Sequence, residues 1–284
     1  MSSTALAPGR LETLLGELRK IPAFFRRDLL VMWSYRLAFF SDWINLIAQL
    51  VVFYYVAKLV DPRTLPSFNG VEPTYMEFVG VGIALASFMQ VALGRVVAAI
   101  RTEQLQGTLE ALLVTPTSPA TIQIGSVVYD LAYIPIRTVT FLVMAALFFG
   151  IHYFASGLLP VCAILMVFIP FIWGLGILGA AATLTFRRGS GIVGLGASVL
   201  TLTSGSYFPV QLFPGWVQTP IRLNPIAIAL NASREALIGG TGWSQILPAV
   251  LALVPFMILS LAVGIVAWRW ALRRERRRGT LGLY

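Results

Sequence analysis

Long runs without a charged side chain divide the sequence into apolar segments. No Asp, Glu, Lys or Arg occurs from Thr138 to Phe186, from Gly189 to Ile221 or from Ala236 to Trp268, and two shorter runs come earlier in the chain. A helix needs about 20 apolar residues to cross a hydrocarbon core about 30 Å thick. The pattern predicts an all-α integral membrane protein with six spans, over residues 37–60, 76–100, 121–150, 158–186, 190–208 and 245–270.

The distribution of Lys and Arg predicts how these spans are oriented. The side that holds residues 1–36 and 269–284 carries sixteen basic residues, and the opposite side carries four. Cytoplasmic loops of membrane proteins are the ones enriched in Lys and Arg. Both termini are therefore expected in the cytoplasm, which agrees with an even number of spans.

Two irregular segments flank or interrupt the spans. Residues 1–36 contain leucines at helical spacing from Leu11 to Leu18, followed by four basic residues between Arg19 and Arg27. This pattern predicts an amphipathic helix on the cytoplasmic leaflet, and a frayed basic tail is the alternative. Residues 209–235 carry four prolines, which favours short re-entrant helical pieces packed against the spans. The six-span domain is predicted over 37–270 and a basic cytoplasmic tail over 271–284.

Composition excludes several classes of protein. Only 12% of the 284 residues are charged, 57% are hydrophobic and the mean hydropathy is +0.81, whereas a soluble domain carries about 25% charged residues. An ordinary soluble enzyme and a disordered chain are both excluded. The net charge of +9 could suggest nucleic acid. Because the basic residues gather at the termini and beside apolar runs, we expect a lipid bilayer as the partner instead.

The sequence lacks the residues that nucleotide or metal chemistry requires. A Walker A loop needs Gly-Lys-Ser/Thr, but the two lysines, Lys20 and Lys58, follow Arg19 and Ala57. One His and one Cys cannot supply a zinc site. Two GxGxxG motifs, starting at Gly174 and Gly189, fall in apolar segments and are interpreted as helix-packing residues. We expect no catalytic site, metal or cofactor in this chain.

Polar residues inside the predicted spans are costly unless they are buried or hydrated. Asp42, Asn45 and Gln49 share one face of the first span, and Ser87 and Gln90 share a face of the second. Asp130 and Arg137, seven residues apart, share a face of the third span and could be linked through an intermediate group. Such residues either fix helix packing or line a polar pathway or a subunit interface. For Asp130 and Arg137 the packing interpretation is favoured.

A segment between the second and third spans resembles a docking element. Residues 101–119 combine two acids, Glu103 and Glu110, with a leucine patch that ends at Pro116. The string E-x-x-x-G-T-L-E-x-L-L-x-T-P resembles the coupling helix of the permease subunits of type-2 ABC exporters, the ABC-2 family. A second similarity lies in the segments SGSYFP from Ser204, FPGW from Phe213 and LNP from Leu223.

The resemblance implies a role for several residues. The coupling helix, over 101–116, would dock on an ATP-binding-cassette ATPase through Glu103, Gly107, Thr108, Glu110, Leu113, Thr115 and Pro116. A second contact could come from Arg187 and Arg188, although these arginines also fit the general excess of cytoplasmic positive charge. In this family the pathway forms between two permease chains, and here it would involve Asn45, Gln49, Ser87, Gln90, Ser204 and Tyr207.

The implied protein is an exporter permease in a bacterial inner membrane. It would pair with a second permease, expected to be an identical chain, and with two ATPase subunits that bind ATP and Mg. The substrate would be an amphipathic or lipid-linked molecule. A non-transporting scaffold or sensor coupled to an ATPase is the alternative function. Import is disfavoured because the sequence contains no large outer domain for a binding protein, and a membrane-embedded enzyme because the catalytic residue sets are missing.

Overall fold

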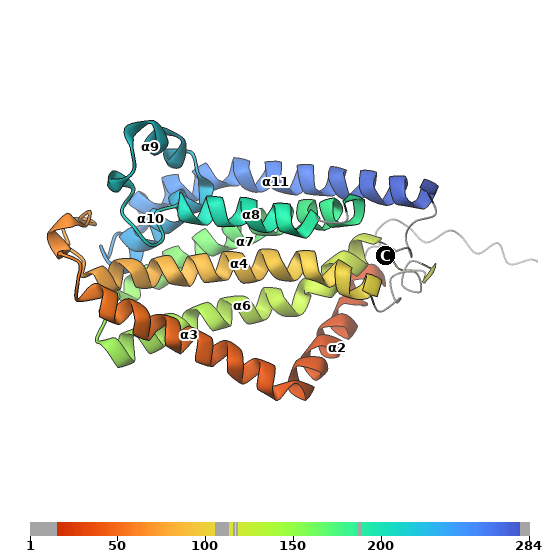
Figure 1. The fold of residues 1–284 in the computed structure, drawn as a ribbon, viewed down its shortest axis with the longest axis horizontal. Helices are drawn as coiled ribbons and strands as arrows, with labels where there is room; N and C mark the ends of the chain where they lie inside the picture. The colour runs from red at the N-terminus through yellow and green to blue at the C-terminus, as the bar shows by residue number, and fades with distance from the viewer. Residues whose placement is uncertain (1–15, 106–113, 116, 118, 187–188, 279–284) are drawn as a thin grey trace, which may run out of the picture.

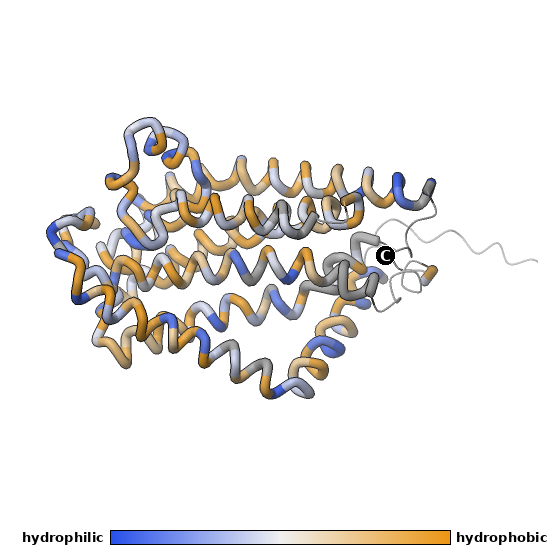
Figure 2. The backbone as a smooth tube through the Cα atoms, viewed as in Figure 1, coloured by the Kyte–Doolittle hydropathy of each residue, from blue (hydrophilic) through white to orange (hydrophobic). Residues whose placement is uncertain are grey.

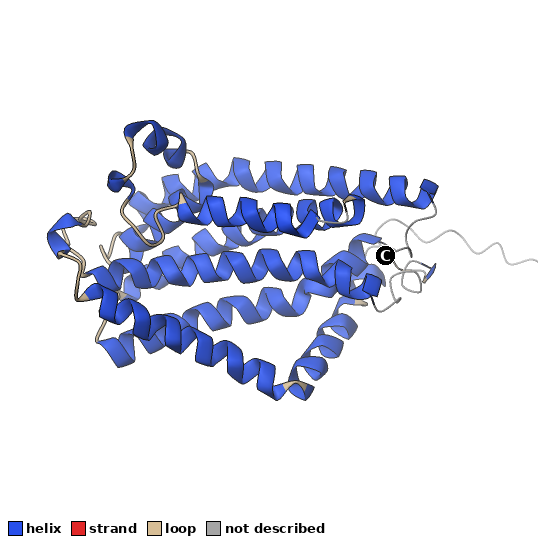
Figure 3. Ribbon diagram, in the orientation of Figure 1, coloured by secondary structure: helices blue, strands red, loops and turns tan. Residues whose placement is uncertain are grey.

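The computed structural model describes residues 16–105, 114–115, 117, 119–186 and 189–278. The described residues form helices and no strands, so the predicted all-α class is confirmed (Figure 3). The α-helices are α2 (Ile21–Ser34), α3 (Arg36–Ala57), α4 (Tyr75–Leu105), α6 (Pro119–Phe149), α7 (Leu158–Thr185), α8 (Gly189–Leu202), α9 (Gly215–Arg222), α10 (Pro225–Leu237) and α11 (Trp243–Arg278). Three short 3₁₀ helices are η1 (Pro62–Thr64), η2 (Ala155–Gly157) and η3 (Val210–Leu212).

The long helices form an elongated bundle around α7, which contacts α4, α8, α10 and, most extensively, α11. Figure 1 shows α2 meeting α3 at a sharp bend, with α2 at the same end of the bundle as the C-terminal end of α11. Helix α9 and the loop after α3 lie at the opposite end. Hydrophilic residues gather at the two ends and in α2, and hydrophobic residues follow most of the helix lengths (Figure 2).

Four helical stretches among the described residues are long and apolar enough to cross a membrane. They are Tyr75–Ala98, Val128–Phe149, Ala155–Thr185 and Trp243–Glu275. Helix α3 carries a shorter apolar stretch, Trp43–Ala57, and α8 has only 14 residues. Large apolar side chains such as Leu251, Ile258 and Val266 are exposed along α11, as expected where lipid replaces water around the helices.

Several helices end at residues other than those predicted. Helix α8 stops at Leu202 rather than at 208, because the chain turns through Gly205, which has a φ of +79° that L side chains rarely adopt. Helix α4 continues without a break to Leu105 and so includes the first residues of the predicted coupling segment. Helix α11 continues to Arg278 and so includes eight of the fourteen residues of the predicted tail.

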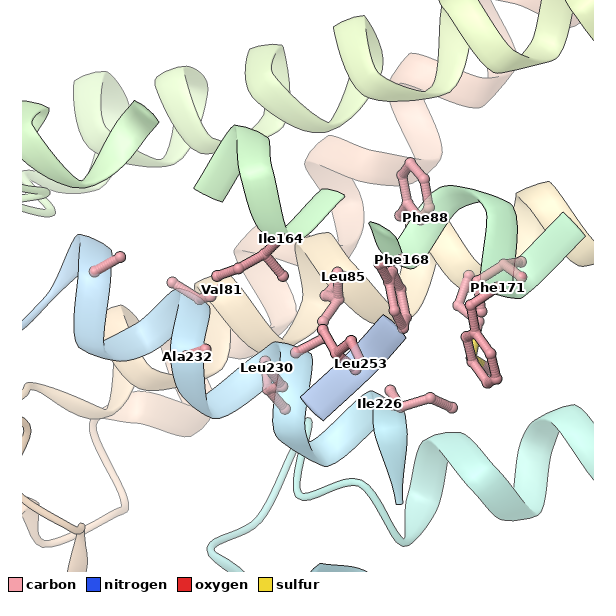
Figure 4. Close-up of a cluster of buried hydrophobic side chains, with 14 of the residues drawn as sticks. Val81, Leu85, Phe88, Ile164, Phe168, Phe171, Ile226, Leu230, Ala232 and Leu253 are labelled. Atoms are coloured by element: carbon pink, nitrogen blue, oxygen red, sulfur yellow. The ribbon is translucent and has the colours of Figure 1, made fainter. Parts of the chain in front are cut away.

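The proline-rich segment is built of separate helical pieces, and its last piece lies in the core. Helix α10 is capped by Asn224, whose Oδ1 accepts a hydrogen bond from Ile226 N at 2.9 Å while its Nδ2 donates to Leu200 O of α8 at 3.0 Å. Figure 4 shows α10 side chains such as Leu230 meeting residues of α4, α7 and α11 in one buried cluster. This cluster includes Val81, Leu85, Phe88, Ile164, Phe168, Phe171, Ile226, Leu230, Ala232 and Leu253.

Glycines allow the closest helix contacts inside this bundle. A Cβ at Gly174 would meet Ser260 and Leu261 of α11, and one at Gly176 would meet Val96 of α4. These contacts support the helix-packing interpretation of the first GxGxxG motif. Gly191 and Gly194, in the second motif, have no neighbouring atom within 4 Å of such a Cβ in the described part of the chain.

Candidate functional site

A polar cavity of about 520 Å³ lies between α3, α4 and α6. Its lining combines amides, hydroxyls, a guanidinium and a few apolar side chains: Asn45, Leu46, Ala48, Gln49, Val52, Ser87, Gln90, Arg137 and Tyr207. Five of the six residues proposed from the sequence as pathway residues are brought together here. Asn45 and Gln90 are exposed, so the cavity opens at the side of the single chain.

The spacing of residues along two helices builds most of the lining. Asn45, Gln49 and Val52 lie four and three residues apart on α3 and therefore share one face, and Ser87 and Gln90 do the same on α4. An adjacent face of α3 presents Leu46 and Leu50 to a buried apolar cluster with residues of α4 and α6. This apolar contact holds α3 in place and aims its polar face into the cavity.

Tyr207 reaches the cavity from the turn that follows α8. Its ring stacks on Phe53 of α3 with a centroid distance of 5.7 Å. The hydroxyl of Tyr75, at the start of α4, donates to the carbonyl oxygen of Tyr207 at 3.2 Å. The turn is therefore attached to both helices that provide most of the lining.

Ser204, the sixth of these residues, does not line the cavity. It is fully buried in the turn after α8, where its Oγ donates to Thr201 O and lies beside Ser206 Oγ, both at 2.6 Å. These bonds join the turn to the last turn of α8 and to itself. In the structure Ser204 thus contributes to the shape of the turn that carries Tyr207.

Arg137 is a cavity residue that the sequence argument did not place there. It comes from α6 and is buried, with 6% of its surface exposed. Asp130, which the sequence linked to Arg137, lies instead beside Arg95 of α4, with 3.8 Å between Arg95 Nε and Asp130 Oδ1. The one signal for Arg137 in the sequence was a charge inside a predicted span. Whether Arg137 lies at the same depth as Asn45 and Ser87 depends on how α3, α4 and α6 pack, which spacing along one helix does not determine.

A second buried arginine, Arg234, connects two helices and the turn after α8. Arg234 of α10 donates from Nε to Phe78 O at 3.1 Å, and from Nη2 to Gly205 O at 3.0 Å and Ser206 O at 3.2 Å. Its guanidinium carbon lies 3.5 Å from the centre of the Phe78 ring, a cation–π contact. One side chain thus joins α10, α4 and the turn that carries Tyr207.

The predicted ATPase-docking residues fall mostly outside the described residues. Glu103 lies in the last turn of α4, and Thr115 is exposed. The remaining predicted contacts lie outside the described part of the chain: Gly107, Thr108, Glu110, Leu113, Pro116, Arg187 and Arg188.

Helix α2 packs on α6, the helix that begins at Pro119 just after the predicted coupling helix. The Phe25 ring lies 5.8 Å from that of Tyr129, and the Phe24 ring occupies the space that a Cβ at Gly125 would fill. Helix α2 is therefore joined to α6 close to where α6 begins.

The described residues contain no group of three or more His, Cys, Asp or Glu that could hold a metal ion. A comparison with curated proteins finds no match for the chain.

The sequence does match the family described as "ABC-2 type transporter" over residues 19–238, which is most of its length. Domains of this family are permease components and not nucleotide-binding domains, and the apolar helices of the bundle agree with a place in a membrane. The family as a whole works with ATPase subunits. The chain therefore belongs to the ABC-2 type transporter family and is a transmembrane component of an ABC-type transporter.

Proposed function

We propose that this chain is the permease of an exporter that moves an amphipathic or lipid-linked substrate out of the cell. The observation that carries the proposal is the polar cavity between α3, α4 and α6 in a bundle whose outer surface is apolar. Polar groups at membrane depth usually mark a substrate pathway when they face a cavity. The energy would come from ATP, bound with Mg in a separate ATPase subunit.

The proposed topology has six spans, α3, α4, α6, α7, α8 and α11, with both termini in the cytoplasm of a bacterial cell. Helix α8 would span about 21 Å at 1.5 Å per residue. The turn at Ser204, Gly205 and Ser206 would continue it toward the outer surface. Non-helical backbone is tolerated at membrane depth where protein buries it, and these three residues are buried.

The proposed coupling helix lies between two helices that line the cavity. Helix α4 has 31 residues, more than the roughly 20 that a hydrocarbon core requires, and its end leads directly into residues 106–118. Helix α6 follows them and carries Arg137. Closure of the ATPase subunits on ATP would push this segment and tilt α4 and α6, which changes the width of the cavity between them.

A second copy of this chain and two ATPase subunits would complete the transporter. The cavity opens at the side of the single chain, where Asn45 and Gln90 are exposed. A second chain against this side would enclose the polar groups between two bundles and keep them from lipid. Gly191 and Gly194 of α8, where no described atom lies within 4 Å of an added Cβ, would allow close approach of a partner helix.

Charge reversal at Glu103 is expected to detach the ATPase. The tagged permease is purified from its own host in mild detergent, and mass spectrometry quantifies any ATP-binding-cassette protein that is recovered with it. Wild type should recover one such protein near one to one. Glu103→Lys should recover it at about one tenth of that level, as expected for the loss of a charged contact at an interface.

Glu72→Lys provides the control, because Glu72 is an exposed acid in the loop between α3 and α4, at the other end of the bundle. It should leave recovery unchanged. If wild type recovers no ATPase under conditions that preserve other membrane complexes, the exporter proposal is wrong. If Glu103→Lys recovers as much ATPase as wild type, the docking site lies elsewhere.

A cysteine in the cavity is expected to react with a water-soluble reagent. Cys162, the single cysteine, is first replaced by Ser. Gln49→Cys should then react with sulfonatoethyl methanethiosulfonate about ten times faster than Val51→Cys, because only a hydrated thiol forms the reactive thiolate readily. Val51 is exposed on the same helix and does not line the cavity. Equal rates would show that the cavity is not a hydrated pathway.

A further inference from the structure

We propose that the outward face of α2 binds an anionic phospholipid, with Arg26 and Arg36 contacting the head group and Trp33 contacting the acyl chains. The occupant of this face is thus a lipid of the surrounding bilayer. The inference goes beyond export, and it needs only that α3 crosses the membrane as proposed above. It follows from the length of α3, the two faces of α2 and the balance of charge in this part of the chain.

Helix α2 lies where the chain enters the membrane. Helix α3 has 22 residues, which extend over about 33 Å at 1.5 Å per residue and so match a hydrocarbon core about 30 Å thick. Its first residue, Arg36, is therefore expected at the level of the lipid head groups. The chain bends sharply there (Figure 1), because Tyr35 leaves the helical region with a φ of −97° and a ψ of +56°. Helix α2 thus turns away from the direction of α3 at the membrane surface.

One face of α2 is covered by α6. Phe24 and Phe25 are half-buried there, and the Phe25 ring lies 5.8 Å from that of Tyr129. Asp28, four residues after Phe24 and three after Phe25, shares this face and is also half-buried. The opposite face of α2 is therefore directed away from the bundle.

The outward face of α2 combines apolar side chains with arginine. Arg26, Leu30 and Trp33 share this face because they lie four and three residues apart. Leu30 is 58% exposed and Trp33 is 71% exposed. Arg36 follows the bend, and its guanidinium carbon lies 5.8 Å from the centre of the Trp33 ring. Exposed apolar residues beside basic ones are typical of helices that lie in the membrane interface, where Trp is enriched.

The charge of this segment favours an anionic lipid over a neutral one. Residues 16–36 contain five basic and two acidic residues, and the whole stretch 1–36 contains six basic and three acidic residues. Both acids of 16–36 form ion pairs within the segment, at 2.6 Å between Lys20 Nζ and Glu17 Oε1 and at 2.8 Å between Arg27 Nε and Asp28 Oδ1. The other basic residues of the segment are Arg19, Arg26 and Arg36. Each basic residue near a membrane surface adds to the attraction for anionic lipid.

The test measures which lipid lies next to Trp33. The full-length permease, purified with the subunits that accompany it, is reconstituted in phosphatidylcholine with brominated acyl chains, which quench tryptophan fluorescence on contact. The difference between wild type and Trp33→Phe gives the signal of Trp33 alone. Unbrominated phosphatidylglycerol or unbrominated phosphatidylcholine is then mixed in. Phosphatidylglycerol is expected to restore the Trp33 signal at about one fifth of the mole fraction that phosphatidylcholine requires, a fivefold preference.

Charge variants assign this preference to α2, each measured with and without Trp33→Phe. The double variant Arg26→Gln, Arg36→Gln should bring the preference close to one. Brominated phosphatidylcholine should still quench its Trp33, because the apolar side chains remain. Both arginines are exposed, so the double variant is expected to fold. In wild type, 1 M NaCl should also abolish the preference, since it shortens the screening length to about 3 Å.

Arg222→Gln is the matched control, because it removes an exposed arginine at the end of α9, at the opposite end of the bundle. It should keep the fivefold preference at Trp33. Equal effects of the two unbrominated lipids in wild type, or an unchanged preference in the double variant, would overturn the inference. Absence of any quenching of Trp33 by brominated lipid would also overturn it, and would indicate a protein partner on this face.

These outcomes are separate from the test of the proposed function. A preparation that contains no ATPase would contradict the exporter proposal, whereas the lipid preference at Trp33 can still be measured in it. Conversely, a complex with its ATPase but without any lipid preference at Trp33 would overturn this inference and leave the exporter proposal in place.

Discussion

Gly82→Ala is expected to destabilise the bundle strongly. Gly82 lies on α4 where this helix passes the turn after α8, and an added Cβ would collide with the carbonyl oxygen of Ser206. It would also lie 2.8 Å from the carbonyl carbon and 2.9 Å from Arg234 Nη2. These atoms belong to backbone and to a fully buried side chain, so they cannot move without disturbing the hydrogen bonds of Arg234.

Overpacking a core of this kind is expected to lower the free energy of unfolding by about 2 kcal/mol. Size-exclusion chromatography and the thermal unfolding of the purified protein, followed by tryptophan fluorescence, measure the effect. Gly82→Ala should yield aggregated protein or a Tm lower by several degrees.

Gly94→Ala is the matched control, because it makes the same change on the same helix. A Cβ at Gly94 would have no atom of the described residues within 4 Å, and Ala stabilises a helix relative to Gly by about 1 kcal/mol. Its Tm should be equal to that of wild type or higher. If both variants unfold at the wild-type temperature, α4 does not contact the turn after α8 as closely as the structure indicates.

The positions of the helices were predictable because lipid-facing and core positions are both apolar in a membrane bundle. A charge-free run then follows the full length of a helix, as in α6, which was predicted over 121–150 and is found over Pro119–Phe149. The end of α8 was not predictable in this way. The apolar run continues through the turn at Gly205, so hydropathy does not change where the helix stops.

The candidate site was predictable to the extent that it depends on one helix at a time. Asn45 and Gln49 share a face because of their spacing, and so do Ser87 and Gln90. The apolar stretch of α3, Trp43–Ala57, contains Asn45 and Gln49, so the polar face of the cavity lies within this apolar stretch.

The contribution of Arg137 depends on packing between helices, and sequence spacing does not determine it. Its spacing from Asp130 suggested a pair within α6, but α4 supplies Arg95 at 3.8 Å from that acid. Ser204 shows the opposite case. The family resemblance implied a pathway role for both Ser204 and Tyr207, whereas the turn directs the Ser204 side chain into the protein and that of Tyr207 to the cavity.

Replacing Arg234 by Leu is expected to destabilise the protein more severely than Gly82→Ala. Arg234 is 1% exposed, and no carboxylate of the described residues lies within ion-pair distance of it. Its charge is compensated by three carbonyl oxygens and by the face of the Phe78 ring. The arginine therefore acts as a cross-link between α10, α4 and the turn that positions Tyr207.

Loss of the guanidinium would leave the carbonyl oxygens of Gly205 and Ser206 buried without a donor, at about 1–3 kcal/mol for each. Arg234→Lys keeps the charge, but a single ammonium cannot reproduce the planar fork or the stacking on Phe78. We expect a Tm several degrees below that of wild type for Arg234→Lys and no recoverable folded protein for Arg234→Leu.

Arg222→Leu is the control, since Arg222 is an exposed arginine at the end of α9, close in sequence to Arg234. Its Tm should stay within about one degree of wild type, because surface substitutions usually change stability by less than about 0.5 kcal/mol. A Tm for Arg234→Leu as high as that of Arg222→Leu would mean that the carbonyl oxygens have other donors in the membrane. The turn after α8 would then keep its shape, and Tyr207 its place at the cavity, without Arg234.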